Sequence, residues 1–388
     1  MITLFWVAVV VLGYTYIGYP ALIGAWARWR PRAAMRSNHT PTVSIVIVAH
    51  NEGARIRERL ENLITLDYPR DRVEILLASD GSDDDTVERA RAYAGVGVRV
   101  LVFPTRRGKA ATLNQVVPQA TGDVILLGDA RQRFDRRVIR ELVASFADPR
   151  VGAVSGELAF FDDTETSPIQ SGVGFYWKYE KFIRASESAV DSTVGATGAI
   201  YALRRGLFQP IPEDTLLDDV LVPMRIVRKG YRVLFERGAI AADRIASSGA
   251  EEFTRKVRTI AGNFQLVARE PWVLDPSRNR LWLQTVSHKL LRLASPLFLL
   301  TAFLTNLLLV DASLYGALLG LQLVFYSSAI YGSQRSRRGR RSPLLGLPYV
   351  FCLLNWATVV AFWRFITCQQ SVTWERGLTR PSASRGAP

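Results

Sequence analysis

The chain has 388 residues, of which 48% are hydrophobic, and a formal net charge of +14 at pH 7. It is long enough for one large domain or two ordinary ones, but its charge-free segments argue against a wholly water-soluble protein. Its three histidines match no zinc spacing, and its two cysteines fall in or beside the last apolar segment, so neither a zinc site nor a disulfide is expected. Because many arginines flank apolar segments, the positive charge favours membrane lipids as partners and no nucleic acid.

Four stretches without a charged residue predict transmembrane helices: residues 1–26, 293–310, 312–331 and 342–363. A bilayer span needs about 20 apolar residues, and the alternative, a buried core helix, seldom runs so far without a polar stripe. The first stretch has neither the basic start nor the small-residue cleavage site of a signal peptide. We therefore expect it to be a retained anchor.

Clusters of arginine predict which side of the membrane each loop faces, because short cytoplasmic loops accumulate Lys and Arg. One cluster follows the first stretch and another lies between the third and fourth: Arg28, Arg30, Arg32 and Arg36, then Arg335, Arg337, Arg338, Arg340 and Arg341. We expect a multi-pass protein of the inner (plasma) membrane with residues 38–285 in the cytoplasm. The side of the C-terminus stays open, because counting crossings places it outside whereas Arg376, Arg380 and Arg385 favour the inside.

Between the first and second apolar stretches, β-rich runs alternate with helical patterns. The runs cover residues 43–49, 73–79, 98–103 and 124–128, and the helical patterns cover residues 54–66, 84–93 and 109–119. This alternation predicts an α/β fold with a doubly wound, mainly parallel sheet. The expected organisation is an N-terminal transmembrane helix (1–27), a cytosolic α/β domain (38–250), interfacial amphipathic helices (251–292), three transmembrane helices (293–366) and a C-terminal tail (367–388).

Polar side chains follow three of the predicted strands. Asn51 and Glu52 come after the first strand, Asp80 after the second and Asp129 at the end of the fourth. Open parallel sheets bind ligands beyond the carboxyl ends of their strands, so we expect these residues at one crevice. The acids at positions 83–85 are explained instead as capping and first-turn residues of the next helix.

Asp129 stands in the tetrapeptide Gly-Asp-Ala-Arg at positions 128–131. Alone this is a weak signal, because an aspartate that ends a strand is often a turn residue. Mg²⁺ and Mn²⁺ nevertheless take oxygen ligands and commonly keep waters and substrate phosphates, so a single carboxylate can suffice. We expect Mg²⁺ or Mn²⁺ as the cofactor, bound through Asp129.

Two further segments carry charges suited to chemistry. Asp218 and Asp219 lie in the first turn of a predicted amphipathic helix, where either could complement the helix dipole. For two adjacent acids, the better explanation is that one caps the helix and the other is a general base. On a later helix, Arg255, Lys256 and Arg258 fit either anchoring at a membrane interface or binding of a pyrophosphate.

Six segments in this order resemble membrane-embedded family 2 glycosyltransferases, the group of hyaluronan, cellulose and poly-N-acetylglucosamine synthases. The segments are IVIVAHNE, LLASDGSDDDT, RRGKAATLNQ, LLGDAR, VGATGAIYALRR and LLDDVLVPMRI, framed by one apolar stretch before them and three after. The resemblance runs from GYTYIGYP in the first stretch to SHKLLR and beyond. It implies a type A glycosyltransferase fold, which is Rossmann-like with a mainly parallel sheet, a nucleotide-sugar donor and inversion at the anomeric carbon.

The resemblance also implies roles for individual residues. For the nucleotide they are Asn51, Glu52, Asp80 and Lys109; for the metal, Asp129; for catalysis, Asp219 as base with its neighbour Asp218, and Arg258 at the leaving group; for the acceptor, Gly198 and Arg204. Trp177 is a candidate for stacking on a sugar, as are Tyr176 and Trp272, although packing or interface anchoring is the favoured explanation for each ring.

Two positions depart from the family pattern. Residues 129–131 read Asp-Ala-Arg, so a cation replaces the second carboxylate of the metal motif, and metal binding would rest on Asp129 and the donor phosphates. Residues 255–259 read Arg-Lys-Val-Arg-Thr where processive synthases have Gln-x-x-Arg-Trp. The arginine is kept as Arg258, but the tryptophan that borders the acceptor sugar is absent.

The expected function is therefore inverting transfer of a sugar from a nucleotide-diphosphate donor, a UDP-sugar, to a growing polysaccharide. Two alternatives stay open. Non-processive transfer to a polyprenyl-phosphate or glycolipid acceptor would suit the missing tryptophan, and a catalytically degenerate membrane partner of a synthase would suit Arg131. The sequence leaves the sugar, the linkage and the oligomeric state undetermined.

Overall fold

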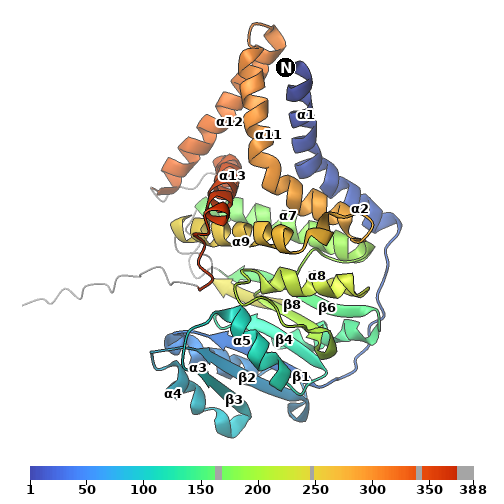
Figure 1. Ribbon diagram of the computed structural model, residues 1–388, viewed down its shortest axis with the longest axis vertical. Coiled ribbons are helices and arrows are strands. Elements are labelled where there is room, and N and C mark those ends of the chain that lie inside the picture. Colours follow the sequence, from blue (N-terminus) through green and yellow to red (C-terminus); the bar gives the residue numbers. More distant parts are fainter. Residues whose placement is uncertain (162–167, 245–248, 338–342, 374–388) are drawn as a thin grey trace, which may run out of the picture.

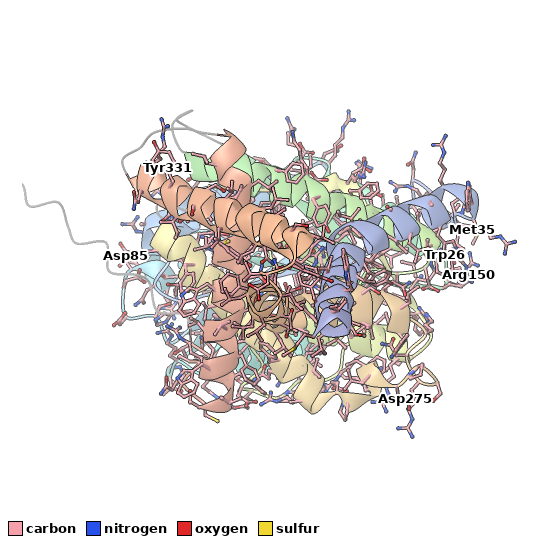
Figure 2. All side chains as sticks on the ribbon, turned by 90° about the horizontal axis from the view of Figure 1, so that it is seen from above. Trp26, Met35, Asp85, Arg150, Asp275 and Tyr331 are labelled. Atoms are coloured by element: carbon pink, nitrogen blue, oxygen red, sulfur yellow. The ribbon has the colours of Figure 1, made fainter. Side chains whose placement is uncertain are left out.

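The computed structural model describes residues 1–161, 168–244, 249–337 and 343–373. In this part of the chain a sheet domain lies at one end, long apolar helices lie at the other, and a layer of helices separates them (Figure 1). Figure 2 views the molecule from the end that carries the long helices, and there Trp26 and Met35 lie on one side of the molecule, where the first of these helices passes into the linker.

The described residues form one sheet of eight strands in the order β3-β2-β1-β4-β7-β6-β8-β5. The strands are β1 Val43–Ala49, β2 Val73–Asp80, β3 Val98–Phe103, β4 Val124–Asp129, β5 Arg133–Phe134, β6 Val151–Phe161, β7 Ile200–Arg204 and β8 Arg232–Arg244. Strand β1 pairs in parallel with β2 and β4, and β2 pairs in parallel with β3. Strand β7 is antiparallel to both of its neighbours, and β5 is antiparallel to β8. The predicted α/β fold with a mainly parallel sheet is confirmed.

The register brings the ends of several strands to one edge. Val48 of β1 lies beside Asp129 of β4, and β2 ends at Asp80. Because β7 runs the other way, it begins at this same edge, with Ile200 beside Gly128. The carboxyl ends of the parallel strands and the start of β7 thus frame one crevice.

Helices cover both faces of the sheet, as the continuous apolar runs of its central strands require. One core contains residues of α5 Lys109–Val116 and α8 Asp218–Arg228. The other contains residues of α3 Gly53–Ile64, α4 Thr86–Arg91 and α6 Val138–Ala144.

The three helices predicted in this part of the chain are all shorter than predicted. Helix α3 ends at Ile64 instead of residue 66. Helix α4 begins at Thr86. Asp84 Oδ1 accepts the Thr86 backbone N–H at 3.0 Å and so satisfies the first N–H group of the helix. This contact agrees with the capping role expected for the acids at 83–85. Helix α5 ends at Val116 and passes into a tight turn that contains Pro118, a residue without a backbone N–H.

The separating layer consists of α7 Pro168–Val190 and α9 Gly249–Arg269 (Figure 1). Helix α9 places Val257 and Ala261 in the same core as α5 and α8. Its Phe264 packs against Phe362 of α13 Pro343–Ile366, with 5.3 Å between ring centroids. The layer therefore belongs to the sheet domain on one side and to the long helices on the other.

Within the described residues, four helices are long and apolar enough to cross a membrane: Ile2–Trp29, Trp282–Leu308, Ser313–Arg335 and Leu345–Ile366. The first comprises α1 Ile2–Gly13, a π-helical turn and α2 Tyr19–Trp29; the second contains α11 Leu291–Leu308; the third lies in α12 Ser313–Arg337. They correspond to the four predicted stretches. The second begins at Trp282 rather than at residue 293, because the polar turn before α11 is helical and packs against α7.

A buried hydrogen-bond cluster fastens α7 to the first two long helices. His288 is 2% exposed, and its ring nitrogens lie 2.7 Å from Glu180 Oε1 and 2.8 Å from Glu187 Oε1. Tyr19 donates to Glu187 at 2.6 Å, and Arg292 donates to Glu180 at 2.8 Å. Because Glu180 and Glu187 are buried although they are charged, apolar periodicity alone did not predict helix α7.

Candidate active site

The loops after β1 and β2 are tied together by their own polar groups. Asn51 has a φ of 54°, a left-handed conformation that is uncommon outside glycine. Its side-chain oxygen accepts the Asp83 backbone N–H at 3.0 Å, and the Glu52 N–H donates to Thr86 Oγ1 at 2.8 Å. The Gly53 N–H donates to Asp84 at 3.0 Å. These contacts hold the predicted nucleotide residues Asn51 and Glu52 on a fixed backbone.

Asp80 is the anchor of the loop that leads into α5. The residue is 3% exposed, and its two carboxylate oxygens accept the backbone N–H groups of Arg107 and Gly108, each at 2.8 Å. The loop can approach so closely because Gly81 has a φ of 63°, and a Cβ there would lie 2.4 Å from the Arg106 nitrogen. Asp80 therefore fixes the backbone immediately before Lys109.

Lys109 joins two of the predicted acids. Its Nζ lies 3.1 Å from Asp129 Oδ1 and 3.4 Å from Asp218 Oδ2. The three residues come from the start of α5, the end of β4 and the start of α8, which meet at the edge where the parallel strands end. Residues separated by about a hundred positions in sequence thus share one site.

The charges at this site shift one another's proton affinities. Burial would lower the pKa of Lys109, but Asp129, Asp218 and Asp219 outweigh it and hold that pKa above its usual value. Burial would raise the pKa of Asp129, but Lys109 and Arg131 outweigh it and hold that pKa below its usual value. At neutral pH the lysine is charged and Asp129 is ionised.

Asp219 has a different environment from its neighbour. Burial, followed by the charge of Asp218, raises the pKa of Asp219 to about 6. Its carboxylate accepts the backbone N–H of Gly198, and a Cβ at position 198 would lie 3.2 Å from Asp219 Oδ2. The Ala196 N–H donates to the Asp219 carbonyl at 2.7 Å. The loop that contains Gly198 therefore packs directly on Asp219, and a carboxylate with this pKa suits a general base near neutral pH.

Tyr201 belongs to the site although the sequence analysis did not select it. Its hydroxyl donates to Asp218 Oδ2 at 3.2 Å, and the residue is fully buried on β7 opposite Leu127. In the sequence it stands in the run Ile-Tyr-Ala-Leu, which is typical of a core strand. Only the antiparallel direction of β7, which no local pattern indicated, brings its hydroxyl to the acids.

Arg258 reaches the same site from α9. Burial lowers its pKa, and the charges of Asp218, Asp129 and Asp219 act against that shift, which places the guanidinium near all three acids. Arg258 also donates to the carbonyl of Val372 at 3.2 Å. A Cβ at Gly108 would lie 3.3 Å from the Val372 side chain, so the segment after α13 lies over the start of α5.

Arg131, the unusual residue of the metal motif, has a buried carboxylate beside it. Its Nε lies 3.1 Å from Asp243 Oδ2, and Gln132 donates to the same oxygen at 3.0 Å. Asp243 is 6% exposed and comes from β8. The sequence analysis missed Asp243 because the end of β8 carries no recognisable motif. Its charge offsets that of Arg131 next to Asp129.

Two predicted acceptor residues lie elsewhere. Arg204 pairs with Val124 at the opposite edge of the sheet, where it donates to the carbonyls of Phe146, Asp148 and Val151 at 2.8 to 3.0 Å. It does not join the acid cluster and instead closes the turn before β6.

Trp177 lies on α7, where its ring makes an edge contact with Phe160 at 5.3 Å between centroids and Lys256 Nζ lies 5.1 Å from the ring centre. Packing between α7 and α9 accounts for this ring, as it does for its neighbour Tyr176, which lies 4.8 Å from the same ammonium.

The residues present fit a divalent cation that is held mainly by a diphosphate. Asp129 is 34% exposed at its side chain, so it is accessible from the crevice, and one of its oxygens is bonded to Lys109. Among the described residues, no group of three or more His, Cys, Asp or Glu side chains forms a metal cage. A single carboxylate together with phosphate oxygens and waters is a usual environment for Mg²⁺ or Mn²⁺.

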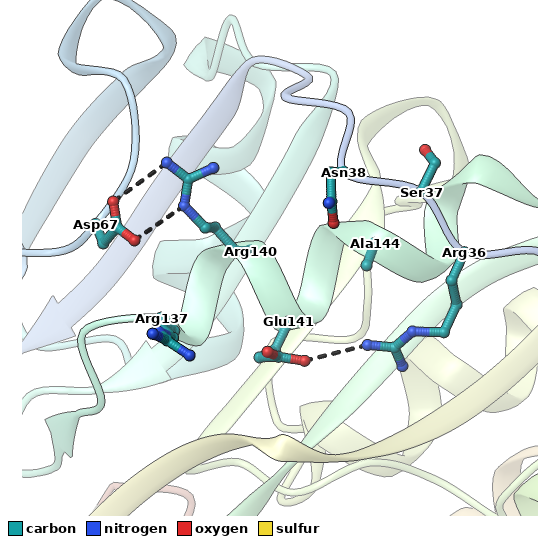
Figure 3. Close-up of a pocket in the computed structure, with 8 residues that line it drawn as sticks. All are labelled: Arg36, Ser37, Asn38, Asp67, Arg137, Arg140, Glu141 and Ala144. Atoms are coloured by element: carbon teal, nitrogen blue, oxygen red, sulfur yellow. Dashed lines mark hydrogen bonds and ion pairs between the residues drawn. The ribbon is translucent and has the colours of Figure 1, made fainter.

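A separate pocket of about 470 Å³ lies over α6, away from the acids (Figure 3). Figure 3 shows that its charged walls are cross-linked by ion pairs: Arg140 with Asp67, and Arg36 with Glu141 at 3.1 Å. The Ser37 N–H donates to the Ala144 carbonyl at 3.1 Å. The pocket thus lies where the linker after the first long helix is attached to α6, through the Arg36–Glu141 ion pair and the Ser37–Ala144 hydrogen bond.

The described residues form a GT-A fold, the fold of a solved glycosyltransferase. The solved mannosyltransferase PcManGT from Pyrobaculum calidifontis, in complex with GDP-Man and Mn²⁺, has a similar structure, with a TM-score of 0.74 and 22% sequence identity. The similarity covers 94% of this chain and 99% of that one, so it includes the long helices as well as the sheet domain.

Part of the sequence matches a known family. Residues 44–210 match the family described as "Glycosyl transferase family 2". This segment contains the loops after β1, β2 and β4 together with the start of α5, and ends before α8. The resemblance predicted from the six segments is confirmed.

Curated relatives of part of the chain are named as a glycosyltransferase, a glycolipid synthase and a polysaccharide synthase. The chain is 27% identical over 259 residues to "Probable glycosyltransferase YdaM" of Bacillus subtilis, an alignment that covers 62% of this chain and 59% of the relative. It is 32% identical over 154 residues to "Beta-monoglucosyldiacylglycerol synthase" of Trichormus variabilis, covering 38% and 33%. It is 23% identical over 239 residues to "Poly-beta-1,6-N-acetyl-D-glucosamine synthase" of Staphylococcus aureus, covering 59% and 56%. The chain thus spans between a third and three fifths of these relatives.

Proposed function

We propose that this protein is an inverting membrane glycosyltransferase that moves a sugar from a nucleotide-diphosphate donor, a UDP-sugar, to a growing polysaccharide. The observation that carries the proposal is the meeting of Lys109, Asp129 and the Asp218–Asp219 pair at the edge where the parallel strands end. A glycosyl transfer needs cations at the diphosphate and a base at the acceptor, and this site supplies both.

The donor would lie along the loops after β1, β2 and β4. In this arrangement Asn51, Glu52 and the loop anchored by Asp80 contact the nucleoside, and Lys109 contacts the diphosphate. The geometry that supports this order is the fixed backbone at Asn51 and the position of Lys109 directly after the two amides that Asp80 holds.

In the reaction the acceptor hydroxyl attacks the anomeric carbon on the face opposite the diphosphate. Its oxygen forms the new bond to carbon while the bond from that carbon to the diphosphate oxygen breaks, and its proton passes to Asp219. The nucleoside diphosphate leaves with the bonding electrons, and single displacement inverts the anomeric centre. A divalent cation bound through Asp129 would supply positive charge at the diphosphate. Lys109 and Arg258 supply it from the protein, where negative charge develops.

The acceptor is proposed to reach Asp219 past the Gly198 loop. A growing polysaccharide is supported by the synthase relative, whereas non-processive transfer to a polyprenyl-phosphate or glycolipid is supported by the glycolipid synthase relative and by the missing tryptophan after Arg258. The size of the product separates them, because only a processive enzyme releases long chains.

A third reading, a degenerate partner of a synthase, had Arg131 in its favour. The buried Asp243 offsets that charge, and the base and its cations are retained, so the proposal of an active enzyme accounts for more of the site. We further propose a multi-pass protein of the inner membrane with the sheet domain in the cytoplasm. The proposed division of the chain is an N-terminal transmembrane helix (1–27), a cytosolic domain (38–250), interfacial helices (251–292), three transmembrane helices (293–366) and a C-terminal tail (367–388).

The test is release of nucleoside diphosphate by the purified protein in detergent, with Mg²⁺ or Mn²⁺ and a panel of nucleotide sugars. Asp219→Asn should lower the rate about 10²- to 10⁴-fold, because general-base catalysis contributes about that factor, while UDP affinity stays within about threefold. Asp275→Asn, at a half-buried aspartate just before the second long helix, serves as the matched control. Normal turnover by Asp219→Asn would remove the base assignment, and no release with any donor would remove the proposal.

A further inference from the structure

We propose that Tyr201 is a positioning residue whose hydroxyl anchors Asp218, so that Asp219 and not Asp218 receives the acceptor proton. The inference rests on the proposed function, because it divides roles within the acid pair at which transfer would occur. It concerns a residue that reads as ordinary core in the sequence.

The first support is the geometry around one oxygen atom. Asp218 Oδ2 lies 3.2 Å from the Tyr201 hydroxyl and 3.4 Å from Lys109 Nζ. Asp218 is 7% exposed and Tyr201 is 0% exposed, so the hydroxyl has a carboxylate in place of solvent as its partner. This oxygen accepts a hydrogen bond from the hydroxyl and lies beside the ammonium, so it is less available than Asp219 to take the acceptor proton.

The second support is that the hydroxyl keeps its proton. Burial, followed by the charges of Asp218 and Asp219, holds the pKa of Tyr201 well above its usual value. Tyr201 is therefore a permanent donor over the working pH range. Because β7 fixes its backbone between β4 and β6, the hydroxyl cannot follow Asp218 if that side chain moves.

The third support is the contrast with Asp219. This carboxylate accepts a backbone N–H from Gly198, and its pKa is raised to about 6 by burial and by the charge of Asp218. Tyr201 thus acts on the base indirectly: its hydrogen bond holds Asp218, so that a proton taken up by the pair resides on Asp219.

Two substitutions should move the pH profile in opposite directions. The wild-type rate should fall as pH drops through about 6, because Asp219 accepts a proton only when ionised. Tyr201→Phe removes one donor from Asp218, so the pair holds a proton more tightly and the midpoint should rise by about one unit. Asp218→Asn removes the neighbouring charge, so the midpoint should fall by about one unit. In Tyr201→Phe the rate at pH 7 should drop roughly two- to tenfold with an unchanged KM for the donor.

Tyr68→Phe is the matched control. Tyr68 is also buried in the sheet domain, and its hydroxyl donates to the Pro41 carbonyl at 2.7 Å. Its substitution removes a shorter hydrogen bond, to a carbonyl and not to an acid, so the midpoint of the pH profile should not move. If Tyr201→Phe likewise lowers stability or rate without moving the midpoint, Tyr201 is only a packing residue and the inference is overturned.

A titration without substrate separates this inference from the proposed function. The infrared absorption of protonated carboxyl groups can be followed against pH in the wild type, and the part lost in Asp219→Asn reports Asp219. This absorption should titrate near pH 6 and shift upward in Tyr201→Phe. If the shift occurs but no donor is turned over, the inference stands and the function fails. If turnover is normal and the absorption titrates identically in both proteins, the function stands and the inference fails.

Discussion

Asp80 offers the sharpest test of how the nucleotide side of the site is built. Its carboxylate accepts two backbone N–H groups, from Arg107 and Gly108, at 2.8 Å each. Asp80→Ala would leave both buried donors without their acceptor. A hydrogen bond to a charged group contributes about 1.5–3 kcal/mol, so ordering of this loop should weaken by about 3–6 kcal/mol. Asp80→Asn keeps one acceptor oxygen and should lose about half of that.

The assay combines hydrogen exchange with UDP binding. In Asp80→Ala the amides of Arg107 and Gly108 should exchange at least about a hundredfold faster, since 1.4 kcal/mol is about a factor of ten in an opening equilibrium. UDP affinity should fall with the order of the loop, in the series wild type, Asp80→Asn, Asp80→Ala, because Lys109 follows this segment directly. Asp123→Ala is the control: Asp123 is exposed at the other edge of the sheet and accepts from Thr42 at 2.7 Å.

Two outcomes would refute this reasoning about Asp80. Slow exchange of both amides in Asp80→Ala would show that the carboxylate does not hold the loop. Unchanged UDP affinity together with fast exchange would show that the loop order does not matter for the nucleotide, and Asp80 would then be a turn residue without a part in donor binding.

Two further substitutions test the charges of the site and the attachment of α7. Lys109→Met removes the cation between Asp129 and Asp218. It should raise the KM for the donor about tenfold or more and also raise the pKa of Asp219. The control Lys229→Met, after the end of α8, should change neither quantity. An unchanged KM in Lys109→Met would contradict the proposed contact of Lys109 with the diphosphate. His288→Leu removes one partner from each of the buried carboxylates of Glu180 and Glu187, which keep Arg292 and Tyr19. It should lower the free energy of unfolding by about 1–3 kcal/mol for each hydrogen bond lost, measured by thermal or denaturant unfolding in detergent. His39→Leu, at an exposed position, is the control, and equal stability of the two variants would show that the cluster contributes nothing.

The sheet and most of the acids could be predicted because their signals are local. Continuous β-rich runs followed by polar residues fix both the strands and the edge where Asp80 and Asp129 lie, since parallel strands end at the same edge. Asp218 and Asp219 were found because adjacent acids at a helix start are more than the dipole requires. These inferences need no knowledge of which strand neighbours which.

The residues that were missed or misplaced depend on strand direction. The sequence analysis grouped Gly198 and Arg204 in one acceptor loop, but β7 starts at Ile200 and runs antiparallel to β4. An extended chain rises about 3.3 Å per residue, so the six steps from Gly198 to Arg204 carry the arginine about 20 Å to the opposite edge. The same direction brings Tyr201 to Asp218. Asp243 was hidden for a related reason, because only the pairing of β8 with β6 and β5 places it beside Arg131.

The balance of charges at the site explains why a donor would bring a metal with it. The cations Lys109, Arg131 and Arg258 already face the acids Asp129, Asp218, Asp219 and Asp243. A diphosphate adds at least two negative charges. The cationic side chains of the site are already close to acidic side chains before the donor binds. Burying that surplus without compensation would be costly, whereas a divalent cation held by Asp129 would offset the two charges that the diphosphate adds. Arg131, at the position where the family pattern has a second carboxylate, would lower the negative charge to be offset, and Asp243 balances the charge of Arg131 itself.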